Sequence, residues 1–109
     1  MAEVFNQQQL LAMLGDDEQL YRRFVEKFLR LMDESLVRLE QHVVEQNWQA
    51  MVKELHSLKG MALQISATAL SEQSDQLHQM ALEQDARIQN LMPELRDCVT
   101  QTRRFIMQN

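Results

Sequence analysis

Hydrophobic residues recur at three- and four-residue spacing along nearly the whole chain, as expected for helices that each bury one face. A short first helix is predicted to end at Gly15, a typical residue after the last turn of a helix. Its apolar residues are Phe5, Leu10, Leu11, Met13 and Leu14. Asp16 or Asp17 is placed to cap a much longer second helix, which runs to about Gln46. The breadth of its apolar stripe predicts contact with more than one neighbouring helix.

Two further helices follow, joined by a turn that the sequence marks weakly. Asn47 is a plausible cap for a helix that runs to about Ile65, and residues 66–69 are expected to bend the chain into a helix that ends near Gln84. Neither glycine nor proline marks this bend. A last helix begins at about Ile88 or Asn90, which would place Pro93 in its first turn, where the missing amide proton is not needed.

Short connections between long amphipathic helices favour antiparallel neighbours. We therefore predict an all-α fold, an antiparallel up-and-down four-helix bundle with a short extra N-terminal helix. The 109 residues suffice for one domain with a single core, and only two glycines and one proline interrupt the pattern. Residues 1–109 are accordingly expected to form one domain.

Charge, cysteine content and hydrophobicity limit the partners and the cellular compartment that we expect. The net charge is -5, and no Lys or Arg cluster exceeds a pair, so we expect no nucleic-acid partner. The lone Cys98 cannot form an internal disulfide and fits the reducing cytoplasm. No apolar run approaches the roughly 18 residues of a membrane span, so we expect no membrane insertion of this domain. A cytoplasmic monomer is the expectation.

The third helix carries the candidate chemistry. One face is an apolar stripe, made of Met51, Leu55, Leu58, Ala62 and Ile65. His56, Lys59, Gly60 and Leu63 share a different face, which predicts that the imidazole meets solvent. A mid-helix glycine costs about 1 kcal/mol relative to alanine, which suggests that something approaches the backbone at Gly60. With Lys59 one turn from the imidazole, this arrangement suits a phosphoryl group better than a metal ion.

The run His56-Ser57-Leu58-Lys59-Gly60, continued by residues 61–67, resembles the active-site helix of the histidine-containing phosphotransfer (HPt) domains of bacterial multistep phosphorelays. The resemblance covers essentially the whole chain. It implies that His56 accepts a phosphoryl group from the aspartyl phosphate of a response-regulator receiver domain and passes it to another receiver. A hybrid sensor histidine kinase is a further possible partner.

The resemblance also assigns roles around His56. Lys59 would stabilise charge and Gly60 would admit the partner, while the chain itself would have no kinase activity and no cofactor. Magnesium would belong to the receiver. His78, on the following helix, aligns with a position where relatives often carry Glu or Gln that supports the active histidine. It would support His56 through a hydrogen bond, directly or through water, which a ring separation above about 8 Å would exclude. The alternative, that His78 is an ordinary polar residue at the bundle surface, stays open. Met61 stands where many relatives carry a small residue.

A docking patch for the receiver is predicted beside His56. Its members are Val52, Leu63, Gln64, Leu11 and Leu14. The alternative, that the apolar members of this set are packed under the first helix, stays open. His42 is expected to be an ordinary histidine at the end of the second helix, where a positive charge is favourable.

Three other functions compete with this prediction. A non-catalytic helical adaptor could bind a receiver or dimerise through the wide stripe of the second helix. A carboxylate-bridged metal bundle needs two Glu-x-x-His pairs with further glutamates, whereas the chain offers Asp75-x-x-His78. A dimeric kinase domain is disfavoured because His56 lacks the acidic neighbour usual after such a histidine and no nucleotide-binding domain follows.

Overall fold

The computed structural model describes residues 3–108, and within that range its secondary-structure elements are all α-helices. Its elements are α1 (Gln7–Met13), α2 (Glu18–Val44), α3 (Trp48–Gln64), α4 (Thr68–Leu82) and α5 (Ile88–Gln108). The predicted all-α class, with four long helices and one short N-terminal helix, is confirmed.

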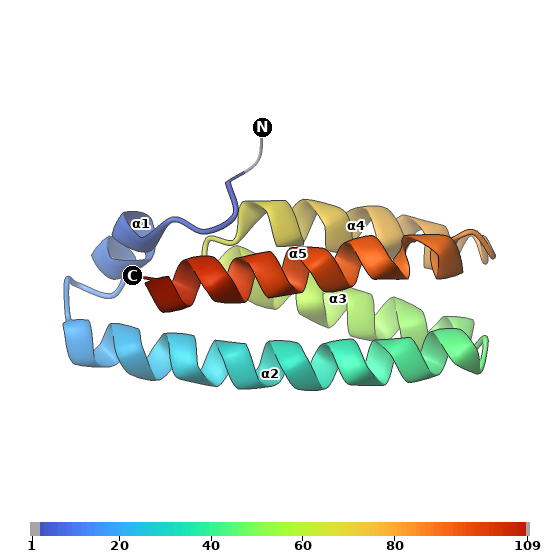
Figure 1. The fold of residues 1–109 in the computed structure, drawn as a ribbon, viewed down its shortest axis with the longest axis horizontal. Coiled ribbons are helices and arrows are strands. Elements are labelled where there is room, and N and C mark those ends of the chain that lie inside the picture. Colours follow the sequence, from blue (N-terminus) through green and yellow to red (C-terminus); the bar gives the residue numbers. More distant parts are fainter. Residues whose placement is uncertain (1–2, 109) are drawn as a thin grey trace.

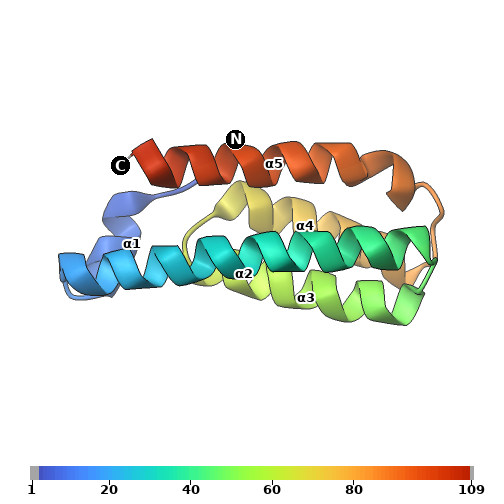
Figure 2. The ribbon, with the colours of Figure 1, turned by 60° about the horizontal axis from the view of Figure 1, so that its bottom comes forward.

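The four long helices form a ring of neighbours. The sequence-adjacent pairs α2 and α3, α3 and α4, and α4 and α5 pack together, α5 closes the ring against α2, and the most extensive packing is between α3 and α4. Figure 1 shows the four helices side by side along the long axis of the molecule, and the turned view in Figure 2 shows α3 and α4 as a hairpin beside α2 and α5. This is the topology of an up-and-down bundle.

The short α1 covers the end of the bundle that α3 and α4 leave open. These two helices have 17 and 15 residues, whereas α2 has 27 and α5 has 21, so α2 and α5 extend beyond the α3–α4 turn. Figure 1 shows α1 at that end, close to the C-terminus. Two backbone hydrogen bonds hold the segment before α1 on the turn, from Asn6 N to Ser66 O at 3.3 Å and from Ala69 N to Glu3 O at 2.7 Å. The end of α3 is thereby fixed.

Each of the four turns follows the same hydrogen-bonding pattern at the end of the preceding helix. After α3, the amide of Ser66 donates to Leu63 O and the amide of Ala67 donates to Ala62 O, while Ser66 has φ of 61°. This pair of bonds around a left-handed residue is the Schellman motif. Only the α1–α2 turn places glycine at the left-handed position, as Gly15. The α3–α4 turn was hard to locate in the sequence because serine occupies that position.

Polar side chains cap the starts of three helices. The carboxylate of Asp17 accepts from Leu20 N at the start of α2, and the side-chain oxygen of Asn47 accepts from Ala50 N at the start of α3. Both caps were predicted. Such caps contribute about 1 kcal/mol each to helix stability. Asn6 caps α1 in the same way, through Gln9 N.

Charged side chains bind α2 to both of its neighbours. Arg103 pairs with Asp33, and Arg96 pairs with Glu40 one heptad away, as antiparallel helices require. On the other side, Glu54 of α3 accepts hydrogen bonds from α2, including one from Arg38 Nε at 2.6 Å. These contacts fix the rotation of α3 about its own axis, and hence the direction in which its exposed face points.

The prediction for Pro93 is wrong. Because α5 begins at Ile88, the proline is the sixth residue of the helix and lies inside it, beyond the first turn. Its missing amide leaves the carbonyl of Gln89 without the usual bond four residues on. The helix starts earlier than Pro93 alone suggests because Asp85 nucleates it: the carbonyl of Asp85 accepts from Ile88 N and its carboxylate accepts from Arg87 N.

Candidate functional site

The predicted apolar stripe of α3 is its buried face. Met51, Leu55, Leu58 and Ala62 are each at most 1% exposed. His56 follows Leu55 by one residue and so projects away from this core, and its side chain is exposed. The imidazole is therefore held at a defined place on a rigid helix, with solvent access to its ring.

His78 of α4 lies directly across from His56. The ring centroids are 5.8 Å apart and the ring planes are tilted by 43°. This separation is below the roughly 8 Å above which the predicted support would be excluded. One water molecule can bridge rings at such a distance. His56 is exposed, whereas His78 is partly buried between the helices. Among the hydrogen bonds of residues 3–108, none joins the two rings directly.

Lys59 does not stand as an unpaired cation. Its Nζ donates to Oδ1 of Asp75 at 2.8 Å, and the two side chains are 36% and 44% exposed. The hydrogen bond from Lys59 lowers the pKa of Asp75 below its ordinary value, and the nearby charges of Lys59 and His78 act in the same direction. Sequence reasoning noticed Asp75 only as one half of an Asp-x-x-His pair. The structure places it in the site as the partner of Lys59.

Two pairs of side chains face each other across the antiparallel helices α3 and α4, His56 with His78 and Lys59 with Asp75. His56 and His78 are equally far along the chain from Ala67, at the α3–α4 turn, and so are Lys59 and Asp75. A tight hairpin brings such equidistant positions opposite each other. This symmetry is the sequence signal that could have identified Asp75 as the partner of Lys59, provided that the turn had been located exactly.

Gly60 leaves an open space on α3, close to these two pairs. A Cβ atom built on this residue would meet nothing within 4 Å. The internal packing of the chain therefore does not require glycine here. The bare backbone lies one turn after His56 on an exposed part of α3, where a partner could approach it.

Comparison with known families assigns the chain. A sequence model described as the Hpt domain matches residues 23–105, which include α3 and α4 entirely. The chain belongs to the Hpt domain family. Comparison with curated proteins and with solved structures gives no significant match. Hpt domains act as phosphocarriers in two-component phosphorelays and work with receiver domains. The resemblance predicted from the sequence is thus confirmed at the level of the family.

The surface around His56 in this Hpt domain is partly apolar. Leu63, two turns after His56, is 57% exposed, and Gln64 beside it is exposed. Val52, one turn before His56, is partly buried and packs against the core. A hollow of about 150 Å³ lies next to Gln64, between α3 and α2. Its walls are made by Phe24, Lys27, Phe28, Leu31, Met61 and Gln64.

The remaining predicted patch residues belong to α1 or follow it. Leu11 and Leu14 are partly buried and pack against the core. Leu11 also lines a small hollow with Tyr21 of α2. Both residues lie at the end of the bundle where α3 terminates, because the segment before α1 is hydrogen-bonded to the α3–α4 turn. They expose less surface than Leu63.

His42 is separate from the site. It lies in the last turn of α2, as predicted, and is partly buried. Its Nδ1 atom is buried without a hydrogen-bond partner among the described residues. His42 is therefore less accessible to solvent than His56, and one of its two ring nitrogens is buried.

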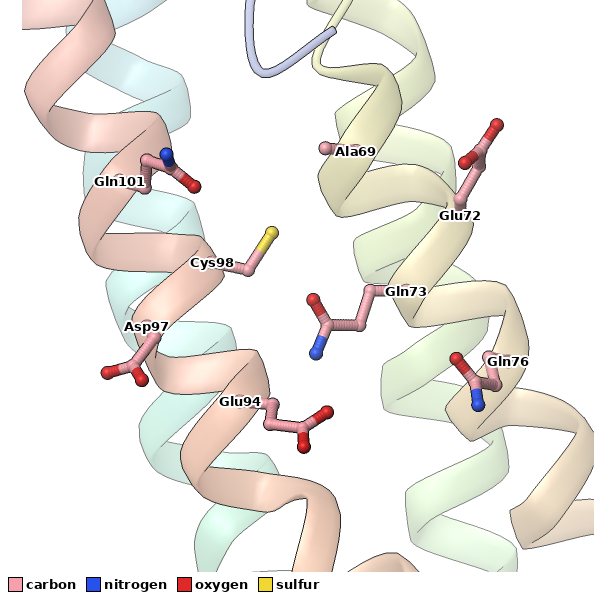
Figure 3. A pocket seen from close by; sticks show the side chains of 8 residues that line it. All are labelled: Ala69, Glu72, Gln73, Gln76, Glu94, Asp97, Cys98 and Gln101. Atoms are coloured by element: carbon pink, nitrogen blue, oxygen red, sulfur yellow. The ribbon is translucent and has the colours of Figure 1, made fainter. Parts of the chain in front are cut away.

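A groove of about 550 Å³ lies between α4 and α5, and none of His56, Lys59 and His78 lines it. Figure 3 shows Gln73 and Gln76 of α4 on one side and Glu94, Asp97 and Cys98 of α5 on the other. Burial raises the pKa of the Cys98 thiol, which keeps it protonated and unreactive. Size alone does not make this groove the functional site.

No group of three or more His, Cys, Asp or Glu side chains between residues 3 and 108 could hold a metal ion. Over the same residues, no helix combines the length and the hydrophobicity needed to span a lipid bilayer.

Proposed function

We propose that His56 is the residue that carries the phosphoryl group, taking it from the aspartyl phosphate of one receiver domain and passing it to another. The observation that carries this proposal is the placement of His56. Its ring is exposed on a rigid helix, faces a second imidazole, and lies one turn from both a lysine and an unobstructed glycine. His42 has none of these features, and His78 is less exposed.

The proposed transfer is a direct displacement at phosphorus. The lone pair of the neutral imidazole, expected at Nε2, attacks the phosphorus atom, and an N–P bond forms. The bond between phosphorus and the aspartyl oxygen breaks, and the carboxylate leaves with the electron pair. An ordinary histidine has a pKa of about 6.5, so a large fraction of such rings is neutral and nucleophilic near neutral pH. No dedicated base is needed to remove a proton from the attacking nitrogen.

His78 is proposed to hold the second nitrogen of His56. When Nε2 attacks, Nδ1 carries the ring proton, and a hydrogen bond to that proton fixes the tautomer and the ring orientation. The neutral His78 ring has one nitrogen that can accept such a bond, and the 5.8 Å centroid distance leaves room for a bridging water. This is the role for which relatives often use Glu or Gln.

Lys59 is proposed to stabilise the phosphoryl oxygens during transfer. Phosphoryl transfer depends mainly on positioning and on stabilisation of charge, so the carrier needs little beyond an exposed ring and a nearby cation. The magnesium ion and the remaining catalytic groups would be supplied by the receiver domain. The chain is accordingly proposed to have no kinase activity and no cofactor of its own.

The receiver is proposed to bind a docking face formed by Val52, Gly60, Leu63 and Gln64 around His56. Leu63 supplies exposed apolar area, and the hollow beside Gln64 can accept an apolar side chain from the partner. Leu11 and Leu14 are proposed as its outer margin, at the end of the bundle covered by α1. A hybrid sensor kinase that contains a receiver would use the same face. We propose a cytoplasmic monomer, in keeping with the lone thiol of Cys98.

A labelling experiment tests the function. The chain is incubated with a panel of phosphorylated receivers, and any label is tested for the acid lability and alkali stability of phosphohistidine. We expect label on the wild type and on the matched control His42→Gln, and none on His56→Gln. An adaptor would retain its activity in the His56→Gln variant. Absence of label with every receiver would favour the adaptor, and label that survives in His56→Gln would refute the assignment of His56.

A further inference from the structure

We propose that Asp75 is a built-in competitor for Lys59, which holds the lysine ammonium while His56 is bare and releases it to the phosphoryl group once His56 is modified. The proposal rests on the proposed function of His56 and adds a residue that controls the cation of that site. It names Asp75 as a positioning residue, since it acts through Lys59 and does not touch the reacting atoms.

The geometry supplies both ends of the exchange. Lys59 follows His56 by three residues on α3, a spacing that places the two side chains on the same face, about 5–6 Å apart at Cβ. The ammonium is nevertheless directed across to α4, where it donates to Asp75 Oδ1 at 2.8 Å. The flexible lysine stem can therefore reach either a phosphoryl group on His56 or the carboxylate of Asp75.

The existing ion pair is of a kind that a stronger anion can displace. Both side chains are more than a third exposed, and exposed ion pairs contribute little because water and salt screen them. A phosphoryl group carries close to two negative charges, with three acceptor oxygens, against the single charge of the carboxylate. Lys59 should therefore prefer the phosphoryl group when it is present and return to Asp75 when it is gone.

The charged and titratable groups around Asp75 are few. Lys59 faces it from α3 and His78 lies one turn after it on α4, and both charges favour the ionised carboxylate. Glu72, one turn before it on α4, is exposed and lines the groove toward α5. If Lys59 moves to the phosphoryl group, Asp75 loses the hydrogen bond that chiefly favours its ionised form.

The experiment measures how strongly Lys59 influences Asp75 in the bare and in the phosphorylated chain. His56 is phosphorylated with phosphoramidate, a small donor that needs no receiver. Nε2 forms an N–P bond, the P–N bond of zwitterionic phosphoramidate breaks, and ammonia leaves with the electron pair. The ¹³C chemical shift of the Asp75 carboxyl carbon is then read by NMR at mildly alkaline pH, where phosphohistidine is stable, in the wild type and in Lys59→Gln, before and after phosphorylation.

In the bare chain we expect Lys59→Gln to change the chemical shift of the Asp75 carboxyl carbon, because the hydrogen bond from Lys59 is lost. In the phosphorylated chain the same substitution should leave that chemical shift nearly unchanged, because Lys59 has already moved away. Comparing the two substitution effects removes the direct repulsion between phosphoryl group and carboxylate, which is present with either residue at position 59. The carboxyl of Glu72 serves as the control and should not respond to Lys59→Gln in either form.

The possible failures are distinguishable. If Lys59→Gln changes the chemical shift of the Asp75 carboxyl carbon equally in both forms, Lys59 does not exchange, and this inference is overturned while His56 remains the phosphoacceptor. If neither phosphoramidate nor any phosphorylated receiver modifies His56, the proposed function and the inference both fall. We also expect Asp75→Asn to shift the equilibrium of phosphoryl transfer from a common receiver about two- to fivefold toward phosphohistidine, relative to the wild type. This factor corresponds to the free energy of an exposed ion pair. That gain should vanish in the Lys59→Gln background.

Discussion

The rings of His56 and His78 lie 5.8 Å apart, centroid to centroid, across the hairpin of α3 and α4. Neither residue could be placed relative to the other from helical periodicity, because they belong to different helices. The hairpin sets one exposed imidazole against a second, more buried one, and this is the arrangement expected when one ring reacts and the other holds it.

Removing the His78 ring should slow phosphorylation of His56. We expect His78→Ala to lower the rate by about 10- to 100-fold, the range for outer partners that orient a functional histidine. His78→Gln should recover most of the rate, because its amide oxygen can accept the same proton. The measurement is single-turnover transfer from a phosphorylated receiver over a range of pH.

A merely structural role for His78 predicts a different result. In that case the alanine and glutamine variants would behave alike, and the pH profile would keep its shape. If His78→Ala transfers at the wild-type rate, the proposed support of His56 is excluded.

Substitution of Gly60 should separate stability from function. Because a Cβ atom there meets nothing within 4 Å, Gly60→Ala should stabilise the fold by up to about 1 kcal/mol, the helix-propensity difference between the residues. Transfer from a receiver should nevertheless slow, and Gly60→Leu should slow it further, because the added side chain stands where the partner approaches. Thermal unfolding and receiver transfer measure the two effects.

Phosphoramidate provides the control for Gly60. This small donor needs no docking face, so it should label His56 in Gly60→Ala as fast as in the wild type. Unchanged transfer from the receiver in Gly60→Leu would show that no partner backbone or side chain approaches this position.

Leu63 should contribute to receiver binding without contributing to stability. It is 57% exposed, and exposed substitutions usually change stability by less than about 0.5 kcal/mol. We expect Leu63→Glu to weaken the affinity for a receiver about tenfold, equivalent to about 1.4 kcal/mol. Leu82 at the end of α4 is 53% exposed, and Leu82→Glu is the matched control. Titration calorimetry measures the affinity of both variants for the receiver. Equal losses of affinity in the two variants would argue against a docking face at Leu63.

Asp85 should contribute to stability in a pH-dependent way. Hydrogen bonds from the side chain and then the backbone of Arg87 lower the pKa of Asp85 below its ordinary value of 3.8. Its contribution is therefore fully present above that ordinary value and is lost as the pH falls through the lower folded-state pKa. Asp85→Asn should destabilise the protein at neutral pH and have little effect in strong acid.

Urea unfolding at several pH values measures this effect. Asp97→Asn removes the same charge from the exposed surface of α5 and serves as the control. A destabilisation by Asp85→Asn that persists unchanged into strong acid would show that the carboxylate charge is not its source.

The local features of this protein were determined by the sequence itself. The spacing of Leu55 and Leu58 placed the buried face of α3, and His56 between them was thereby assigned to the exposed side, as observed. The cap at Asn47 could also be predicted from the sequence, as could the cap of α2 to within one residue, at Asp16 or Asp17. These features depend on residues within one or two turns of each other, and a helix fixes such relationships regardless of the rest of the fold.

The tertiary structure decided what lies across from each residue. The pairing of Lys59 with Asp75 depends on the exact position of the α3–α4 turn, where Ser66 adopts the left-handed conformation without the glycine that usually announces it. A shift of one residue in a turn would rotate every partner on the following helix by about 100°, and local sequence preference is too weak to exclude such a shift.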